Sequence, residues 1–279
     1  MKLTVTVITR DEAAHVGAAL ESVSWADEVI VVDSHSTDDT VAIARSRATR
    51  VEVREWPGYS AQKNYAASLA SNDWILSLDA DERVTPELAT EIKELLRKGP
   101  TECGYRIPRV NWYLGRWIRT TDWYPDYQLR LYDRRTARWN GRRVHESVEA
   151  DRPPGRLKHE LQHYAYRDIS HHLTTIDKYT TLAAEQWHSE GRRTGWFGML
   201  FHPRFAFLRN YVLRGGFRDG DAGLLISQLN SYYVFLKLAK LWELNRQSDN
   251  PNRQSDNLNR QSAVAKSAVI NARSAIKRG

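Results

Sequence analysis

The sequence predicts an α/β protein with a mostly parallel sheet and flanking helices. Apolar strand-like and helical segments alternate through the first hundred residues, a pattern typical of strand–helix–strand units with right-handed crossovers. The expected strands are residues 3–8, 28–33, 51–54 and 74–78. Asp79 and Asp81 directly follow the last of these strands. Open α/β sheets bind ligands at this carboxyl edge, so the pair marks a candidate site.

Asp79 and Asp81 suit metal and sugar binding if Ala80 keeps the chain extended, because both carboxylates then point the same way. One acid can coordinate Mg²⁺ or Mn²⁺ through oxygen, while the other holds a sugar hydroxyl. The alternative is that both are loop acids in front of the next helix. That helix is predicted to begin with Thr85 as its N-cap and Pro86 in its first turn.

The composition fits a globular enzyme with one core of about 240 residues, or two halves that share one core. The chain has 279 residues, of which 41% are hydrophobic and 27% charged, and Cys103 is its single cysteine. One cysteine allows no internal disulfide, which favours a reducing compartment. The N-terminus shows no signal-peptide layout, and no run of 18 apolar residues occurs. We therefore expect a cytoplasmic protein.

The charge is uneven along the chain. Residues 1–100 carry 11 Lys/Arg and 17 Asp/Glu, a net of −6. Residues 101–244 carry 23 and 15, a net of +8, and residues 245–279 carry 7 and 2, a net of +5. Nineteen of the 23 basic residues in the middle part are arginines, which favour forked contacts to phosphate and carboxylate. This part is either a solvated basic face or a surface for an anionic acceptor or membrane.

Other acids also follow expected strands. Asp11 and Glu12 follow the first strand, and Asp33 ends the second, where it either binds a ligand or only caps the next helix. Ser36 or Thr37 is the expected N-cap of that helix. Neither a Gly-x-Gly-x-x-Gly sequence nor a Walker-type phosphate loop occurs, so a diphosphate here would need a metal and basic side chains.

The pattern changes after Pro100. Residues 104–110 and 128–132 read as strands on either side of a segment rich in Trp, Tyr and Arg. Asp126 lies at the end of that segment and can accept a hydroxyl proton as a general base, unless it is only a salt-bridged residue of an aromatic mini-core. His145 or His163 can complete a metal site begun by Asp81, although a lone histidine is more often structural.

The C-terminal part is predicted to be helical. Residues 168–190 form one expected helix, and 196–217 and 221–244 mix aromatic and basic residues that either lie on an anionic membrane or pack on the core. From Asn245 a polar heptapeptide repeat begins, for which we expect disorder. The expected divisions are residues 1–100 for nucleotide-sugar binding, 101–195 for the acceptor and catalysis, 196–244 for C-terminal helices, and 245–279 for the tail.

Four motifs in this order resemble family 2 glycosyltransferases of the GT-A fold, a Rossmann-like architecture. They are Thr9-Arg10-Asp11-Glu12, Val32-Asp33-Ser34-x-Ser36-Thr37-Asp38, Gln62-Lys63-Asn64 and Leu78-Asp79-Ala80-Asp81-Glu82. Further segments resemble the branch of bacterial lipopolysaccharide inner-core enzymes that attach β-glucose to a heptose. These segments are 126–132, Val144-His145-Glu146, His163-Tyr164 and Gly215–Gly220. The resemblance covers about residues 1–244.

The resemblance implies a role for each matching residue. The expected donor-binding residues are Thr9, Arg10, Glu12, Asp33, Lys63, Asn64 and Asp79. Within this set, Asp79 would contact the ribose of a UDP-sugar, and Asp81 would hold Mg²⁺ or Mn²⁺ at the diphosphate, with His145 as a further ligand. Asp126 would be the catalytic base, although relatives often carry two acids there. The expected acceptor-binding residues are Trp123, Tyr124 and Arg130.

Together these residues predict an inverting, metal-dependent transfer of a hexose, with glucose expected, from a UDP-sugar to a lipopolysaccharide core or similar anionic glycolipid. The enzyme would be peripheral on the inner face of the cytoplasmic membrane. A sugar nucleotidyltransferase is the alternative enzyme, but its usual glycine- and arginine-rich loop is missing. A non-catalytic binder of nucleic acid or an anionic surface is the other alternative. Residues 1–244 carry a net charge of only +2, so no nucleic-acid partner is expected.

Overall fold

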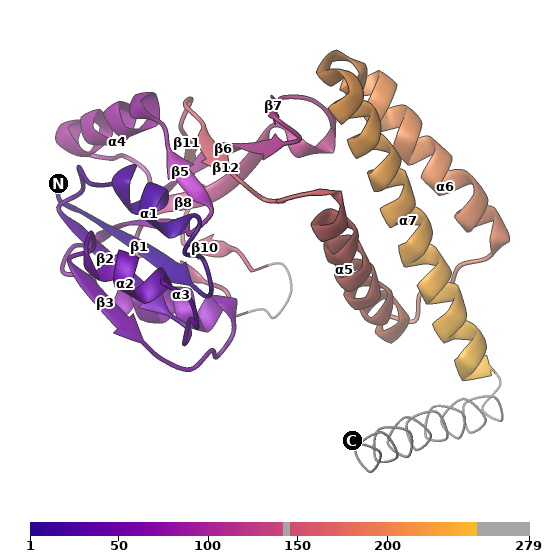
Figure 1. Cartoon of the computed structure of the whole chain (residues 1–279), viewed down its shortest axis with the longest axis horizontal. Coiled ribbons are helices and arrows are strands. Elements are labelled where there is room, and N and C mark those ends of the chain that lie inside the picture. Colours follow the sequence, from indigo (N-terminus) through magenta and orange to yellow (C-terminus); the bar gives the residue numbers. More distant parts are fainter. Residues whose placement is uncertain (142–145, 250–279) are drawn as a thin grey trace, which may run out of the picture. The chain divides into compact units, whose positions relative to one another are not determined.

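The protein is described from a computed structural model that covers residues 1–141 and 146–249 (Figure 1). Its described residues form two compact units. The first contains residues 1–168 and 214–223, and the second contains 169–213 and 224–249. The predicted segments 1–100 and 101–195 both contribute strands to one sheet in the first unit. The repeat tail was predicted to be disordered from Asn245, but residues 245–249 continue the last helix, and residues 250–279 lie outside the described residues.

One large sheet organises the first unit. Four parallel strands run in the order β3 (Arg50–Val53), β2 (Glu28–Asp33), β1 (Leu3–Thr9) and β4 (Trp74–Asp79). The sheet continues through β8, β6, β12 and β5, which are Asp126–Asp133, Gly104–Tyr113, Leu161–His163 and Glu82–Val84. Because β8 is antiparallel to β4 and β6, while β6 and β12 are parallel, the sheet is mixed but mostly parallel.

The minor strands complete the first unit. β7 (Arg116–Ile118) and β11 (Gly155–Arg156) pair with β6, and β9 (Ala137–Trp139) pairs with β10 (Val148–Ala150) in a separate hairpin. Two short 3₁₀ helices, Thr121–Trp123 and Gly216–Asp219, also belong to this unit.

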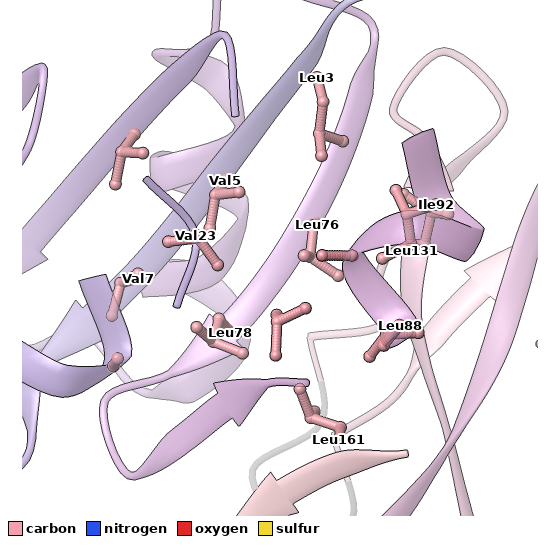
Figure 2. Packing of buried hydrophobic residues seen from close by; sticks show 14 of the residues in the cluster. Leu3, Val5, Val7, Val23, Leu76, Leu78, Leu88, Ile92, Leu131 and Leu161 are labelled. Atoms are coloured by element: carbon pink, nitrogen blue, oxygen red, sulfur yellow. The ribbon is translucent and has the colours of Figure 1, made fainter. Parts of the chain in front are cut away.

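Each face of the sheet has its own apolar core. On one face, residues of β1 and β4 pack against helices α1 (Val16–Glu21), α2 (Thr40–Arg45) and α4 (Pro86–Lys98). Figure 2 shows Leu76 and Leu131 of the sheet beside Leu88 and Ile92 of α4. On the other face, α3 (Tyr59–Ser68) and the β9–β10 hairpin cover β2, β4 and β8. Strands covered on both sides explain the nearly continuous apolar runs in the sequence.

The N-termini of α4 and α2 can be compared with their predicted N-cap residues. Thr85 caps α4 as predicted, since its hydroxyl accepts a bond from the N–H of Leu88 at 3.2 Å. The predicted cap of α2 by Ser36 or Thr37 is wrong. That helix begins after Asp39, and Asp38 instead accepts the N–H of Thr40 at 3.0 Å. The Ser36 hydroxyl instead donates a hydrogen bond to the Asp33 carboxylate.

The second unit is helical. It contains α5 (Ile169–Ser189), α6 (Trp196–Leu208), the π-helical turn Arg209–Leu213, and α7 (Gly220–Asp249) from residue 224 onward. The helix predicted at 168–190 is thus confirmed within one residue at each end. No helix in residues 1–141 and 146–249 has the length and apolar character required to span a bilayer.

Candidate active site

The carboxyl ends of β1, β2 and β4 carry the predicted acids. β4 ends at Asp79, and Ala80 and Asp81 form a turn before β5. The expected extended conformation at Ala80 is therefore wrong, and the two carboxylates have different partners. Asp79 binds two cations, whereas Asp81 faces a histidine. Their separation gives each acid a distinct chemical environment.

Asp79 is held by two buried cations. Its Oδ1 lies 2.9 Å from Nζ of Lys63, and its Oδ2 lies 2.5 Å from Nη2 of Arg130. Burial raises the pKa of Asp79, but the charges and hydrogen bonds of Arg130 and Lys63 outweigh it and hold the pKa well below its usual range. The carboxylate is therefore ionised and fixed in orientation.

Asp81 and His163 form the candidate metal pair. Nε2 of His163 lies 3.3 Å from Oδ2 of Asp81, and its Nδ1 lies 2.6 Å from Oδ1 of Asn111. Because an amide oxygen only accepts, Nδ1 donates in the Asn111 contact, which points Nε2 of His163 toward Asp81. A partner that fixes the ring in this way is typical of metal-ligating histidines.

The donor set fits a divalent cation that also binds substrate oxygens. In the part of the chain that the structure describes, no three His, Cys, Asp or Glu side chains gather into a metal site. A carboxylate and an imidazole would therefore need a diphosphate and water to complete six ligands, which is the usual situation for Mg²⁺. Of the two predicted histidine candidates, His163 lies beside Asp81. His145 falls outside the described residues, and its role stays a prediction.

Glu82 is a buried acid that the sequence analysis did not single out. Its side chain is fully buried, and its Oε1 lies 2.8 Å from Nη2 of Arg130 and 3.1 Å from Nη1 of Arg109. Its Oε2 accepts the N–H of Asp79 at 3.0 Å. Burial lowers the pKa of Arg109, but Glu82 and Asp126 outweigh it and raise that pKa. Glu82 thus connects Arg130, which holds Asp79, with Arg109, which holds Asp126.

Asp126 lies at the start of β8, opposite Arg109 in the register with β6. Its Oδ2 accepts bonds from Nε and Nη2 of Arg109 at 3.0 and 2.7 Å, and its Oδ1 accepts one from Gln128 at 2.6 Å. The side chain is 29% exposed, so solvent or a ligand can reach it. The forked guanidinium contact fixes the direction of the carboxylate.

The strand register gathers this chemistry. On β6, Arg109 and Asn111 are two residues apart and therefore share a face. Arg109 pairs across to Asp126 on β8, while Asn111 pairs to His163 on β12, which in turn pairs to Glu82 on β5. The candidate base and the candidate metal ligand are thus held by the two strands that flank β6 in one sheet.

A bulge explains the position of Arg130. The β6–β8 register jumps from Tyr105–Leu131 to Arg106–Leu129, so Arg130 has no partner on β6. The side chain is only 4% exposed and binds Asp79 and Glu82. The predicted contact between Arg130 and the acceptor would require these ion pairs to break. We therefore assign it to holding Asp79.

The loop after β1 is bonded to the loop after β2. The Thr9 hydroxyl donates to Asp33 at 2.9 Å, and Asp33 also accepts the N–H and hydroxyl of Ser36 at 2.8 and 2.5 Å. Both Thr9 and Asp33 are buried, whereas Arg10 is exposed. Asp33 therefore holds its own turn and does not cap the next helix, which begins after Asp39, and its contact with a donor stays a prediction.

Glu12 lies in an electrostatically unfavourable position. Burial first, and then the negative charges of Asp81 and Asp38, raise its pKa to about 7 from an ordinary 4.5. Burial also lowers the pKa of the neighbouring His15. A cation at Asp81 would offset the repulsion on Glu12, which supports a divalent-ion site at this edge.

Replacing Glu12 by Gln is expected to stabilise the metal-free protein at pH 8 more than at pH 5. The unfolded chain ionises Glu12 above about pH 4.5, whereas the folded chain does so only near pH 7, so folding loses stability as pH rises through this window. Melting temperatures measured with a chelator at both pH values test this. Glu185→Gln, at an exposed position of α5, is the control. An equal shift at both pH values contradicts the assignment.

Two predicted donor residues contact Trp139. The Lys63 ammonium lies 4.3 Å from the centre of the Trp139 ring, beside its ion pair with Asp79. The Asn64 side chain bonds to both the carbonyl and the N–H of Trp139, each at 3.0 Å. Both ends of this amide are engaged in holding β9, so a donor contact by Asn64 would have to break them. The ion pair with Asp79 keeps the Lys63 ammonium at the candidate donor site, and its contact with a donor stays a prediction.

The predicted acceptor aromatics lie in a ring cluster. The Trp123 ring stacks on Tyr166 at 5.5 Å and meets Tyr113 edge-on at 5.3 Å. Burial and a hydrogen bond with Glu160 raise the pKa of Tyr124 to about 12. The mini-core alternative therefore holds for Trp123, while both residues directly precede the segment that carries Asp126. Their acceptor contacts stay predictions.

Comparison with known families decides the class of enzyme. A family model described as glycosyl transferase family 2 matches residues 4–150, more than half of the chain. The chain belongs to glycosyl transferase family 2. The predicted GT-A class of fold, with its mostly parallel sheet and its C-terminal helices, is confirmed.

Relatives of this glycosyltransferase extend along nearly all of it. A lipopolysaccharide core biosynthesis glycosyltransferase, LpsC of Rhizobium meliloti (strain 1021), is 29% identical over 258 residues, covering 90% of this chain and 96% of the relative. An uncharacterized glycosyltransferase of Rickettsia felis is 32% identical over 263 residues, covering 89% and 92%.

Solved structures are similar at lower levels. S. aureus TarS, residues 1–349, in complex with UDP-GlcNAc is 14% identical, with coverage of 91% and 92% and a TM-score of 0.45. Glucosyl-3-phosphoglycerate synthase from Mycobacterium tuberculosis, in complex with Mn²⁺, UDP and glucosyl-3-phosphoglycerate, is 26% identical over 41% of this chain and 44% of that one, with a TM-score of 0.32.

Proposed function

We propose that this glycosyltransferase is an inverting enzyme that moves a hexose, expected to be glucose, from a UDP-sugar to an anionic glycolipid of the lipopolysaccharide core type. The proposal rests on one observation. The strands on either side of β6 hold Asp126, a partly exposed carboxylate on β8, and His163 on β12, which faces Asp81, around the buried network of Glu82. A base and a diphosphate site so joined suit sugar transfer to a hydroxyl group.

The residues divide the reaction between them. Asp126 would accept the proton of the acceptor hydroxyl while that oxygen attacks the anomeric carbon. The bond to UDP breaks on the opposite face, so no covalent sugar–enzyme intermediate is required. Asp79, held by Lys63 and Arg130, would bind the ribose of the donor. Mg²⁺ or Mn²⁺ held by Asp81 and His163 would supply positive charge beside the departing diphosphate.

The acceptor class is supported by charge and by a relative. Residues 101–244 carry a net charge of +8 with 19 arginines, which suits phosphate or carboxylate groups on the acceptor. LpsC, similar along almost its whole length, is a lipopolysaccharide core enzyme by name. Such an acceptor is anchored in a membrane and the donor is a soluble nucleotide, so we expect the enzyme to work peripherally at the inner face of the cytoplasmic membrane.

UDP titration calorimetry tests the donor site. We expect Mn²⁺-dependent binding by the wild type, with the metal-dependent part lost in Asp81→Ala and strongly weakened in His163→Ala, because each removes a ligand beside the diphosphate. His159→Ala is the matched control, since that ring is bound to Glu91 at 2.9 Å on α4. Unchanged metal dependence in both site variants would remove the metal from this pair.

Release of pyrophosphate rather than UDP during turnover would favour the alternative, a sugar nucleotidyltransferase. Coupled assays for the two products, run on the same reaction, distinguish the two enzymes.

Retention on DNA that disappears when residues 245–279 are removed would assign any nucleic-acid affinity to the charged tail, whose net charge is +5.

A further inference from the structure

A stripe of exposed apolar residues runs along α6 and the π-helical turn after it. Exposed apolar residues recur there at intervals of three or four, which places them on one side of a helix. They are Phe197, Phe201, Phe205, Leu208 and Val212. Phe201 and Phe205 are 55% and 58% exposed, far more than aromatic side chains in a packed core.

The opposite side of the same segment already packs on its unit. Pro203, Ala206 and Asn210 are buried, and the Pro203 carbonyl accepts a bond from Ser231 of α7 at 2.8 Å. The helix is thus apolar on both sides, but the contacts with α7 use only one of them. A soluble helix of this kind normally exposes polar residues on its outer side.

The charge of the segment points to the kind of partner. Within the second unit, residues 192–213 contain four arginines and no aspartate or glutamate; Arg192 and Arg193 pair with Glu190 and Asp249. Arg204 lies on the exposed side of α6 within the stripe, four residues before Leu208 and one before Phe205. A hollow of about 530 Å³ between α6 and α7, with Leu200, Arg204 and Phe235 in its lining, adjoins it. Aromatic rings beside the exposed Arg204 guanidinium, on a helix without acids, complement the headgroups of anionic lipids.

We propose that the α6 stripe, defined as Phe197, Phe201, Arg204, Phe205, Leu208 and Val212, inserts into the headgroup region of an anionic phospholipid bilayer. The rings would enter the boundary with the acyl chains, while Arg204 binds phosphate. This inference rests on the proposed function, which requires contact with a membrane, and it assigns that contact to one helix face. It does not depend on the donor or the metal.

Vesicle co-sedimentation of the full chain tests the proposal. Vesicles of phosphatidylglycerol with phosphatidylethanolamine should bind the protein, vesicles of phosphatidylcholine should bind it weakly, and salt at about 0.5 M should reduce the anionic binding. Phe201→Ser combined with Phe205→Ser should lower the partition into anionic vesicles on the order of tenfold or more, because two half-exposed rings lose their apolar contact. Arg204→Gln should weaken binding to anionic vesicles selectively.

Matched controls separate this face from general stickiness. Ile169→Ser combined with Leu173→Ser removes two exposed apolar residues, 40% and 39% exposed and at the same spacing, from α5, and should bind vesicles as the wild type does. UDP affinity should be unchanged in both double variants, which separates failure of this inference from failure of the donor site.

Three results would overturn the proposal. In the first, the wild type ignores anionic vesicles. In the second, the Phe201/Phe205 double variant binds as well as the wild type, which would transfer binding to another part of the chain, such as the basic tail. In the third, light scattering shows a dimer that the double variant converts to a monomer, which would assign the stripe to a second copy of the chain.

Discussion

Asp126→Asn is expected to lower the turnover number about 10²–10⁴-fold while leaving the affinity for UDP nearly unchanged. An amide cannot take the proton of the acceptor hydroxyl, so the general-base contribution is lost. The shape is preserved, and the amide oxygen can still accept bonds from Arg109, which donates to this position at 3.0 and 2.7 Å. A UDP-release assay and UDP calorimetry on the same preparation measure the two quantities.

Asp133→Asn is the matched control. It makes the same chemical change at the other end of β8, where Asp133 lies opposite Trp74 of β4 in the strand register. The Asp133 carboxylate is bound by Arg135 at 2.6 Å. Its turnover should stay close to that of the wild type. Asp126 loses the base role if Asp126→Asn transfers sugar at the normal rate, or if it no longer binds UDP.

Glu82→Gln is expected to destabilise the fold by about 3–5 kcal/mol, because it leaves the buried Arg130 and the partly buried Arg109 short of negative charge. Glu82 is fully buried and binds both Arg130 and Arg109, so solvent cannot replace the lost carboxylate. For a domain of this size the melting temperature should fall by roughly 10 °C. Urea denaturation and thermal unfolding at pH 7 measure the effect.

Glu21→Gln is the control for burial. Glu21 binds Arg47 at 2.7 Å, but the side chains are 70% and 45% exposed, so this change should cost under about 1 kcal/mol. The same substitution at a buried and at an exposed ion pair therefore isolates the contribution of burial. Similar stability losses in the two variants would mean that the Glu82 network is not essential to the fold.

Local patterns in the sequence determined the sheet and the start of the site. Alternating strands and helices predicted a mostly parallel sheet, which β3, β2, β1 and β4 form, since each element shows its own periodicity. Thr85 and Pro86 marked the start of α4 because capping is a local interaction. Asp79 and Asp81 could be located because they directly follow an apolar strand.

Only the tertiary structure decided which side chains complete the site. Glu82 reaches Arg109 and Arg130, 27 and 48 residues later, through strand pairings that have no local periodic signal. Asp81 meets His163 because β12 returns beside β5. Arg130 alternates with apolar residues like an outward-facing strand residue, but one extra residue in β8 directs it to Asp79. Contacts between distant segments depend on register, which residue type and spacing alone do not specify.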